Sequence, residues 1–199
     1  MTSTTPGNFN GWVLAGGQSR RMRQDKALLK LDSQPLALHA AQILAPFVTG
    51  IAIVGDPAKY TSLGFPVTPD LRPDCGPLAG IEAALAATDS DWNLILACDL
   101  PGITEALLKN LLLAASPGTD APDAVIPRHP DNNLEPLCAL YRRRALPVIQ
   151  AALNAGIRKV TDAIAPLTLR YLPVADSRPF NNLNTPEDLQ LYRLGLSNA

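Results

Sequence analysis

Cysteine and histidine are scarce in this sequence. Only 3 cysteines, Cys75, Cys98 and Cys138, occur among 199 residues, and their odd number and wide spacing fit neither a disulfide framework nor a paired C-x-x-C metal site. Free thiols are typical of a reducing compartment, so we expect a cytoplasmic protein. The 2 histidines, His39 and His129, lack partners at the spacing of a metal site or a catalytic triad, which favours structural roles.

The sequence also lacks an excess of charge and a long apolar run. It has 17 basic and 18 acidic residues, a formal net charge of −1, so no overall field attracts nucleic acid or an acidic membrane surface. No apolar run reaches the ~20 residues of a membrane span. The first ten residues carry no basic residue ahead of an apolar core, as a secretion signal would. We expect neither nucleic-acid nor membrane partners, and only local anion sites.

Apolar residues are plentiful enough for one substantial core, at 47% of the chain. A length of 199 residues falls within the roughly 100 to 200 residues of a typical domain. We therefore expect a single domain over residues 1–199. Within it, residues 1–9 are expected to form a loose N-terminal segment, and residues 128–185 a subregion beside one side of the sheet.

Short apolar runs of strand length alternate with longer segments of helical periodicity. The runs bounded by turn residues are 11–16, 51–55, 92–98, 123–127 and 137–141. Apolar residues recur at three-to-four spacing in 35–47, 76–88, 104–115 and 144–156. This alternation predicts an α/β fold with helices on both faces of a mostly parallel sheet. Such sheets bind ligands at the carboxyl ends of their strands.

Glycines and cations follow the first expected strand, in LAGGQSRRMRQDK, residues 14–26. Gly16 and Gly17 let a ligand approach the backbone, so that successive N–H groups can converge on an anion. Arg20, Arg21 and Lys26 then supply positive charge nearby. The combination suits a triphosphate, although a tight turn and a solvated basic patch would explain two glycines alone. The spacing matches neither the P-loop nor the G-x-G-x-x-G dinucleotide fingerprint.

Two aspartates are expected at the same edge of the sheet. Asp99 ends the buried run LILAC, and Asp70 follows FPVTP. Mg²⁺ prefers one or two carboxylates together with phosphate oxygens, so one acid beside a triphosphate is chemically sufficient. Each aspartate also has a plain interpretation, as a turn former for Asp99 and as an exposed loop residue for Asp70.

Two helix starts complete the set of candidate motifs. GPLAGI, residues 76–81, offers close backbone packing and free N–H groups, which also describes a plain helix start. In NNLNTPEDL, Thr185 can cap a helix whose first residue is Pro186. Asn182 and Asn184 precede this cap, where they serve either the turn or a polar ring of a ligand.

These motifs resemble, in the same order, those of a known family. LAGGQSRRMRQDK is similar to the L-A-G-G-x-S-x-R-M-G-x-D-K signature of the molybdenum cofactor guanylyltransferases, the MobA family. GPLAGI, CDLP, EPLCALYRR and FNNLNTPEDL resemble its later motifs, so the resemblance spans residues 11–193. It implies a Rossmann-like, three-layer fold that transfers GMP from GTP to molybdenum-bearing molybdopterin. The products would be molybdopterin guanine dinucleotide and pyrophosphate.

The resemblance implies a nucleotide site. Leu14, Ala15 and Gly16 would contact the guanine nucleotide through backbone groups, with Gly17 beside them. Asp70 would also lie at the nucleotide. The expected partners are GTP, molybdenum-bearing molybdopterin, and molybdoenzyme chaperones or cofactor-insertion proteins.

The resemblance also implies residues that act in the reaction. Asp99 would bind Mg²⁺ at the nucleotide, and Lys26 would hold the phosphates. Arg21 and Lys26 would neutralise the leaving pyrophosphate while the pterin phosphate attacks the α-phosphorus in line, without a protein nucleophile. Asn182 and Asn184 match asparagines on the pterin side of the family's cleft.

The chain departs from the family pattern at two places. Arg23 replaces the signature glycine, and it either strains the loop or adds a third cation. Relatives can carry an asparagine near the base where this chain reads AIVGD, so guanine selectivity would rest on backbone groups. The alternatives are a molybdopterin cytidylyltransferase, whose opening usually reads L-A-A-G, a sugar-phosphate nucleotidyltransferase, and a non-catalytic nucleotide- or cofactor-binding relative.

Overall fold

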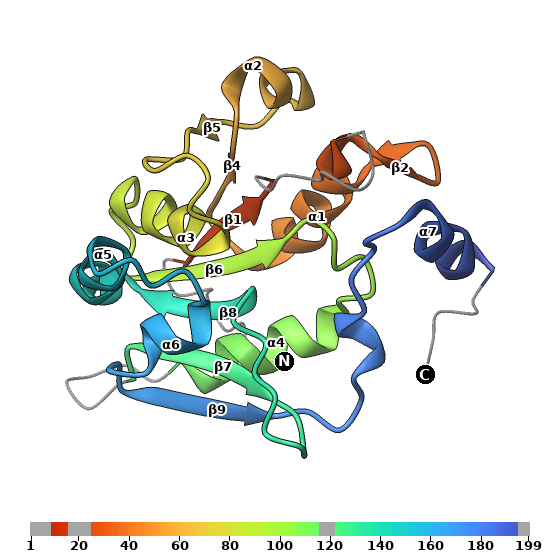
Figure 1. Cartoon of the computed structure of the whole chain (residues 1–199). Helices are drawn as coiled ribbons and strands as arrows, with labels where there is room; N and C mark the ends of the chain where they lie inside the picture. The colour runs from red at the N-terminus through yellow and green to blue at the C-terminus, as the bar shows by residue number, and fades with distance from the viewer. Residues whose placement is uncertain (1–8, 16–24, 116–121, 195–199) are drawn as a thin grey trace.

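A seven-stranded sheet forms the centre of the protein in a computed structural model, which describes residues 9–15, 25–115 and 122–194 (Figure 1). The strands lie in the order β5-β4-β1-β6-β8-β7-β9. Their bounds are β1 Phe9–Leu14, β4 Gly50–Val54, β5 Val67–Thr68, β6 Trp92–Ala97, β7 Ala124–Arg128, β8 Cys138–Arg142 and β9 Leu169–Pro173. A separate ribbon pairs β2 (Lys30–Leu31) with β3 (Gln34–Pro35).

Most strand pairs in the sheet are parallel, as predicted. β1 pairs in parallel with β4 and β6, β4 with β5, and β7 with β9. β8 is the exception, because it runs antiparallel to both β6 and β7. Its connection from β7, residues 129–137, is shorter than the dozen or more residues that a parallel crossover needs.

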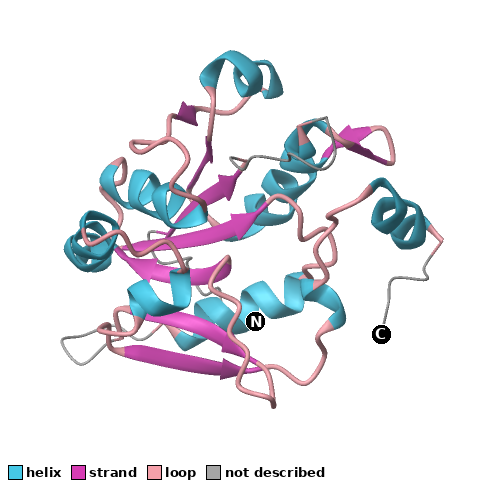
Figure 2. Ribbon diagram, in the orientation of Figure 1, coloured by secondary structure: helices cyan, strands magenta, loops and turns pink. Residues whose placement is uncertain are grey.

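Helices cover both faces of the sheet, which confirms the three-layer prediction (Figure 2). On one face lie α1 (Leu36–Leu44) and α4 (Glu105–Ala114). On the other lie α3 (Pro77–Ala86), α5 (Leu146–Asn154) and α6 (Val160–Ile164). Two further helices, α2 (Pro57–Tyr60) and α7 (Pro186–Arg193), lie beyond the two helical layers.

The alternation of side chains along β1 produces the two cores. Val13 packs with residues of α1 and α4, whereas Trp12 and Leu14 pack on the side of α3. Successive residues of a strand point to opposite faces, so one apolar run serves both layers. The same holds for β6, which is buried along its whole length. This central position fixes the carboxyl ends of β1 and β6 beside each other.

The structure confirms most predicted elements and adds six strands and α-helices among the residues that it describes. The five apolar runs form β1, β4, β6, β7 and β8, and the four periodic segments contain α1, α3, α4 and α5. α7 begins at Pro186 behind Thr185, with a capping box between Thr185 and Asp188. The six that were not predicted are β2, β3, β5, β9, α2 and α6. Residues 1–8 lie outside the described residues, and Phe9 already belongs to β1.

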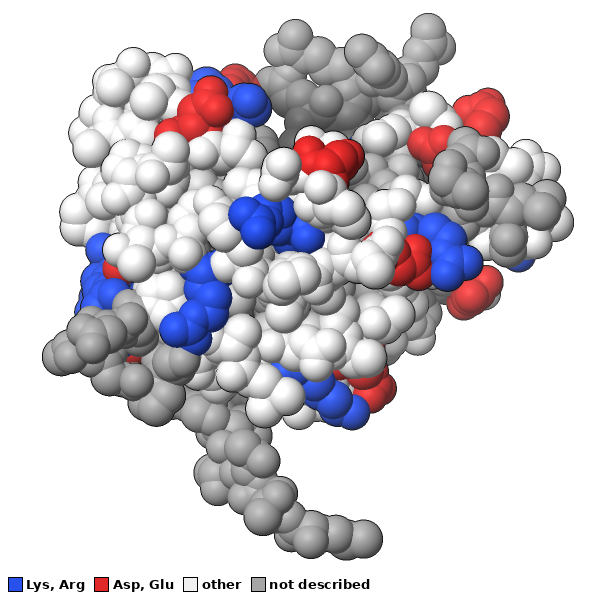
Figure 3. All heavy atoms as spheres, turned by 90° about the horizontal axis from the view of Figure 1, so that it is seen from below, with Lys and Arg blue, Asp and Glu red and all other residues white. Residues whose placement is uncertain are grey.

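Nothing in the described part of the chain offers a membrane span, because none of its helices is both long and apolar enough. On the face shown in Figure 3, basic and acidic side chains are scattered among uncharged residues. This distribution agrees with the near-zero net charge of the sequence.

Candidate active site

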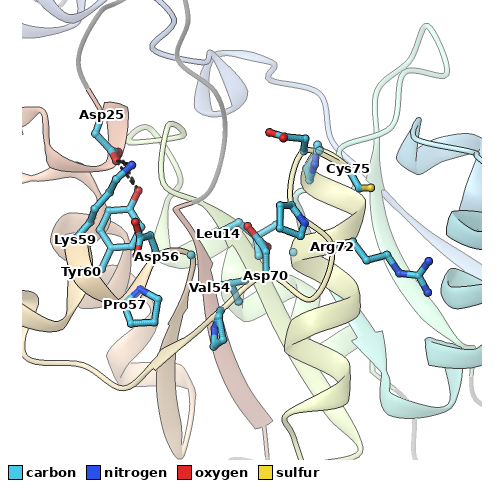
Figure 4. A pocket seen from close by; sticks show the side chains of 17 residues that line it. Leu14, Asp25, Val54, Asp56, Pro57, Lys59, Tyr60, Asp70, Arg72 and Cys75 are labelled. Carbon is cyan, nitrogen blue, oxygen red and sulfur yellow. Dashed lines mark hydrogen bonds and ion pairs between the residues drawn. The ribbon is translucent and has the colours of Figure 1, made fainter.

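A cavity of about 750 Å³ opens at the carboxyl ends of β1 and β4 (Figure 4). Parallel strands bring their carboxyl ends to one edge, where open α/β sheets bind ligands. The volume falls within the ~300–1,000 Å³ of typical small-molecule sites. The loop before α3 forms one wall. Lining residues include Leu14, Val54, Tyr60, Asp70, Arg72 and Cys75.

Leu14 and Asp70 both line this cavity, next to the point where α3 approaches β1 closely. A Cβ atom on Gly80 of α3 would lie 3.2 Å from Leu14 Cδ2 and 3.8 Å from Asp70 Oδ1. Glycine therefore leaves room for both side chains. Asp70 is half-buried, and this desolvation raises the pKa of its carboxyl group. Hydrogen bonds from a polar ligand would offset that cost.

Ala15 is buried at the end of β1, and both of its backbone groups have partners within the protein. Its N–H donates to Val54 O at 3.0 Å, and its carbonyl oxygen lies 3.0 Å from Tyr60 Oη. Backbone contact from Ala15 to a nucleotide therefore stays a prediction. Gly16, Gly17, Arg20, Arg21 and Arg23 lie outside the described residues.

Three motifs that are far apart in the sequence meet beside the cavity. Lys26 Nζ lies 3.3 Å from Asp99 Oδ2 and donates to Asn184 Oδ1 at 2.6 Å. Lys26 begins the 3-10 turn η1 (Lys26–Leu28), and Asp99 follows β6. The side chains of Lys26 and Asp99 are 21% and 23% exposed, so both remain accessible to a ligand. We name Lys26, Asp99 and Asn184 the edge cluster.

The segment that carries Asn184 is fastened directly to the turn that carries Asp99. Leu183 N donates to Asp99 O at 2.9 Å, and the Leu183 side chain is buried with Leu31 and Leu36. Tyr192 of α7 donates from its hydroxyl to Pro101 O at 3.0 Å. These contacts place the Asn184 side chain at the edge cluster. The Asn182 side chain is exposed.

Three residues between the cavity and the edge cluster were not among the predicted site residues: Asp25, Lys59 and Tyr60. Asp25 accepts from Tyr60 Oη at 2.8 Å and lies 3.2 Å from Lys59 Nζ. All three line the cavity (Figure 4), and Asp25 immediately precedes Lys26. Asp25 belongs to the signature motif, so its position in that motif could have predicted a place at the site. Tyr60 has no comparable motif.

The surroundings of the histidines and of the two buried cysteines indicate structural roles. His129 Nε2 is 2.9 Å from Glu135 Oε1, a partner six residues away that sequence spacing did not suggest. His39 Nε2 lies 3.3 Å from Pro101 O. Cys98 and Cys138 are buried, and burial raises the pKa of both thiols. Neither cysteine is therefore a ready nucleophile.

The donor set at the edge cluster fits Mg²⁺ in one way. Across residues 9–15, 25–115 and 122–194, His, Cys, Asp and Glu side chains form no group of three or more that could hold a metal ion. Asp99 supplies a carboxylate at the end of β6. Mg²⁺ accepts such a site when phosphate oxygens and waters complete its shell, so the chemistry of this donor set fits an ion that binds together with a phosphate ligand.

Comparisons with known proteins agree with this geometry. Residues 11–168 match the family model of the MobA-like NTP transferase domain. The molybdenum cofactor guanylyltransferase of Vibrio cholerae is 34% identical over 197 residues, covering 96% of this chain and 95% of that protein. That of Vibrio campbellii is 34% identical over 186 residues, covering 91% and 93%. The crystal structure of molybdopterin-guanine dinucleotide biosynthesis protein A from Archaeoglobus fulgidus has a TM-score of 0.76 at 28% identity, covering 94% of this chain and 98% of that one.

Proposed function

Because the chain belongs to the MobA-like NTP transferase family, we propose that it transfers GMP from GTP to molybdenum-bearing molybdopterin. The products are molybdopterin guanine dinucleotide and pyrophosphate. One observation carries the proposal: the Lys26–Asp99 pair lies beside a nucleotide-sized cavity at the carboxyl edge of the sheet. Guanylyltransferase relatives that are similar over nearly their whole length support the choice of substrates.

In the proposed complex, the nucleoside of GTP occupies the cavity and its phosphates extend toward Lys26. Leu14 would pack against the nucleoside. The half-buried Asp70 carboxylate accepts hydrogen bonds and donates none, which suits the N–H groups on the edge of guanine. The glycine loop, with Gly16 and Gly17, would add backbone N–H groups to the phosphates.

The proposed reaction is an in-line displacement at the α-phosphorus of GTP. An oxygen of the molybdopterin phosphate forms the new P–O bond, and the bond to the β-phosphate oxygen breaks, so that pyrophosphate leaves with the electron pair. Both reactants are anions, so the protein must reduce their repulsion and fix their geometry. Lys26 and Arg21 would neutralise the charge that develops on pyrophosphate.

Asp99 is the residue that would hold Mg²⁺. The ion would act as a Lewis acid on the phosphate oxygens. Lys26, at 3.3 Å, balances the charge of the carboxylate and keeps its position at the end of β6. Its contact with Asn184 then links this charged pair to the segment that would meet the second substrate.

Asn182 and Asn184 would lie on the pterin side of the site. Asn184 already contacts Lys26, and the exposed Asn182 amide is free to turn toward a polar ring. We propose a cytoplasmic location, with molybdoenzyme chaperones or cofactor-insertion proteins as recipients of the product. Neither nucleic acid nor a membrane is proposed as a partner, given the formal net charge of −1.

The proposed function is tested by pyrophosphate release with molybdenum-loaded molybdopterin and either GTP or CTP. We expect Mg²⁺-dependent release with GTP and little with CTP. Turnover with CTP alone would replace the proposal with a cytidylyltransferase. Binding of GTP without turnover would instead favour a non-catalytic relative.

Gly102→Ala tests the pterin side of the proposal. A Cβ atom here would lie 3.1 Å from Pro179 O and 3.2 Å from Pro179 Cα, so the backbone of η5 (Arg178–Phe180) must shift. η5 leads directly into Asn182 and Asn184. We expect the KM for molybdopterin to rise by about fivefold or more, with a smaller change in the Kd for GTP. Steady-state kinetics and calorimetry measure the two effects.

Gly50→Ala is the matched control. A Cβ atom on Gly50 would lie at a similar distance, 3.2 Å, from Asn10 Oδ1, but this neighbour is the end of a side chain and not backbone. Gly50 begins β4, at the end opposite to the cavity. The KM of the Gly50→Ala variant for molybdopterin should stay at the wild-type value. A Gly102→Ala protein with unchanged KM would contradict the assignment of the pterin side.

A further inference from the structure

We infer that Tyr60 is a positioning residue that acts on substrate through Lys26, an inference that rests on the proposed use of GTP. Tyr60 ends α2 and is only 2% exposed. Its hydroxyl lies 3.0 Å from Ala15 O and 3.0 and 2.8 Å from the two Asp25 carboxylate oxygens. Tyr60 thus contacts both the residue that follows β1 and the residue that precedes Lys26.

The contact with Asp25 continues to Lys26 through the backbone. Asp25 is the N-cap of η1, and its Oδ1 atom accepts from Ala27 N at 3.1 Å. Lys26 is the first residue of that turn. Its ammonium group reaches Asp99 and Asn184. An Asp25 side chain that rotated freely would release the start of η1, and with it the origin of the Lys26 side chain.

The hydroxyl of Tyr60 suits this role because it stays protonated. Burial, together with the hydrogen bond to Asp25, raises the pKa of Tyr60 well above its usual value. A neutral phenol can donate at all working pH values, and a hydrogen bond to a charged carboxylate is about twice as strong as one between neutral groups. Lys59 adds a second contact to Asp25 at 3.2 Å, but its side chain is 53% exposed.

A double-mutant cycle on the full chain tests whether Tyr60 acts through Lys26. The four proteins are wild type, Tyr60→Phe, Lys26→Ala and the double variant, and the readouts are the Kd for GTP and the KM for GTP. We expect Tyr60→Phe to weaken GTP binding by about fivefold. On the Lys26→Ala background the same change should alter the Kd by less than about twofold, because coupled residues are not additive.

Tyr141→Phe is the matched control for loss of a buried hydroxyl. Tyr141 is 0% exposed and donates to Pro136 O at 2.8 Å, on a strand that does not line the cavity. This variant should lose thermal stability while its Kd for GTP stays at the wild-type value. The control separates a general loss of packing from an effect on Lys26.

The outcomes distinguish this inference from the proposed function. If wild type binds GTP and Tyr60→Phe binds it equally well, the positioning role is wrong and the function stands. An equal loss of affinity on both backgrounds would likewise overturn it, because Tyr60 would then act independently of Lys26. A wild-type protein that binds no GTP would overturn both.

Discussion

Replacement of Asp99 by asparagine is expected to lower GTP-dependent pyrophosphate release by about a thousandfold or more. Asparagine keeps the size of the side chain but removes the negative charge that would hold Mg²⁺. It also leaves Lys26, 3.3 Å away, without its charged partner. Electrostatic groups of this kind commonly contribute about 10² to 10³ in rate, and the loss of a metal ligand adds to that effect.

The measurement is the turnover rate as a function of Mg²⁺ concentration. Wild type should reach a plateau, and Asp99→Asn should stay far below it even at high Mg²⁺. Asp89→Asn is the matched control, since Asp89 is exposed before the opposite end of β6 and the change removes the same charge. A turnover rate in Asp99→Asn equal to that of wild type would refute the metal role.

The sequence predicted the centre of the fold better than its edges. β6 is buried along its full length. A fully buried strand is mostly apolar in sequence, and this run predicted the strand. β5 has only 2 residues, too few for a periodic pattern. β9 lies at the end of the sheet with intermediate and exposed residues in LRYLP and ends in a proline. Such edge strands lack the apolar run that marks a central strand.

The sequence predicted those parts of the candidate site that lie at the ends of strands. Asp99 was expected at the same edge as the glycine loop because parallel strands bring their carboxyl ends together. The contact of Asp99 with Lys26, at 3.3 Å, was not predicted. Contacts that depend on loops were not visible. Tyr60 and Asp25 are 35 residues apart in the sequence, and no motif around Tyr60 predicts their contact.

An isolated acidic residue in the apolar helix α3 is a sequence feature that indicates a buried ion pair. Glu82 stands alone among the apolar residues of PLAGIEAALA, and it is 1% exposed. A carboxylate that is buried so completely requires a cationic partner. That partner is Arg72, in the loop that also carries Asp70 and lines the cavity. An acid at a core position of a helix can therefore indicate a loop that packs over it.

Arg72→Met is expected to lower the free energy of unfolding by about 2 to 3 kcal/mol. Arg72 Nε donates to both Glu82 oxygens, at 3.2 and 2.9 Å, and Nη1 donates to Asn154 Oδ1 at 2.7 Å. Methionine would leave a buried carboxylate without these bonds. Removing one partner of a fully buried pair costs about 3–5 kcal/mol, and we reduce that figure because the Arg72 side chain is 33% exposed. Urea unfolding measures the change.

Arg178→Met supplies the matched control, because Arg178 and its partner Asp176 are 72% and 48% exposed. Exposed ion pairs contribute little to stability because solvent screens them, so this variant should unfold close to wild type. If Arg72→Met did the same, the pairing would not be what stabilises the buried Glu82.

The double variant Arg72→Met/Glu82→Leu separates stability from nucleotide binding. Replacing both partners with apolar residues removes the unpaired charge, so at least half of the lost stability should return. The loop that carries Asp70 lacks its link to α3 and α5 in both the single and the double variant, so we expect the Kd for GTP to lie above the wild-type value in both. Recovery of GTP affinity together with stability would show instead that Arg72 serves the fold alone.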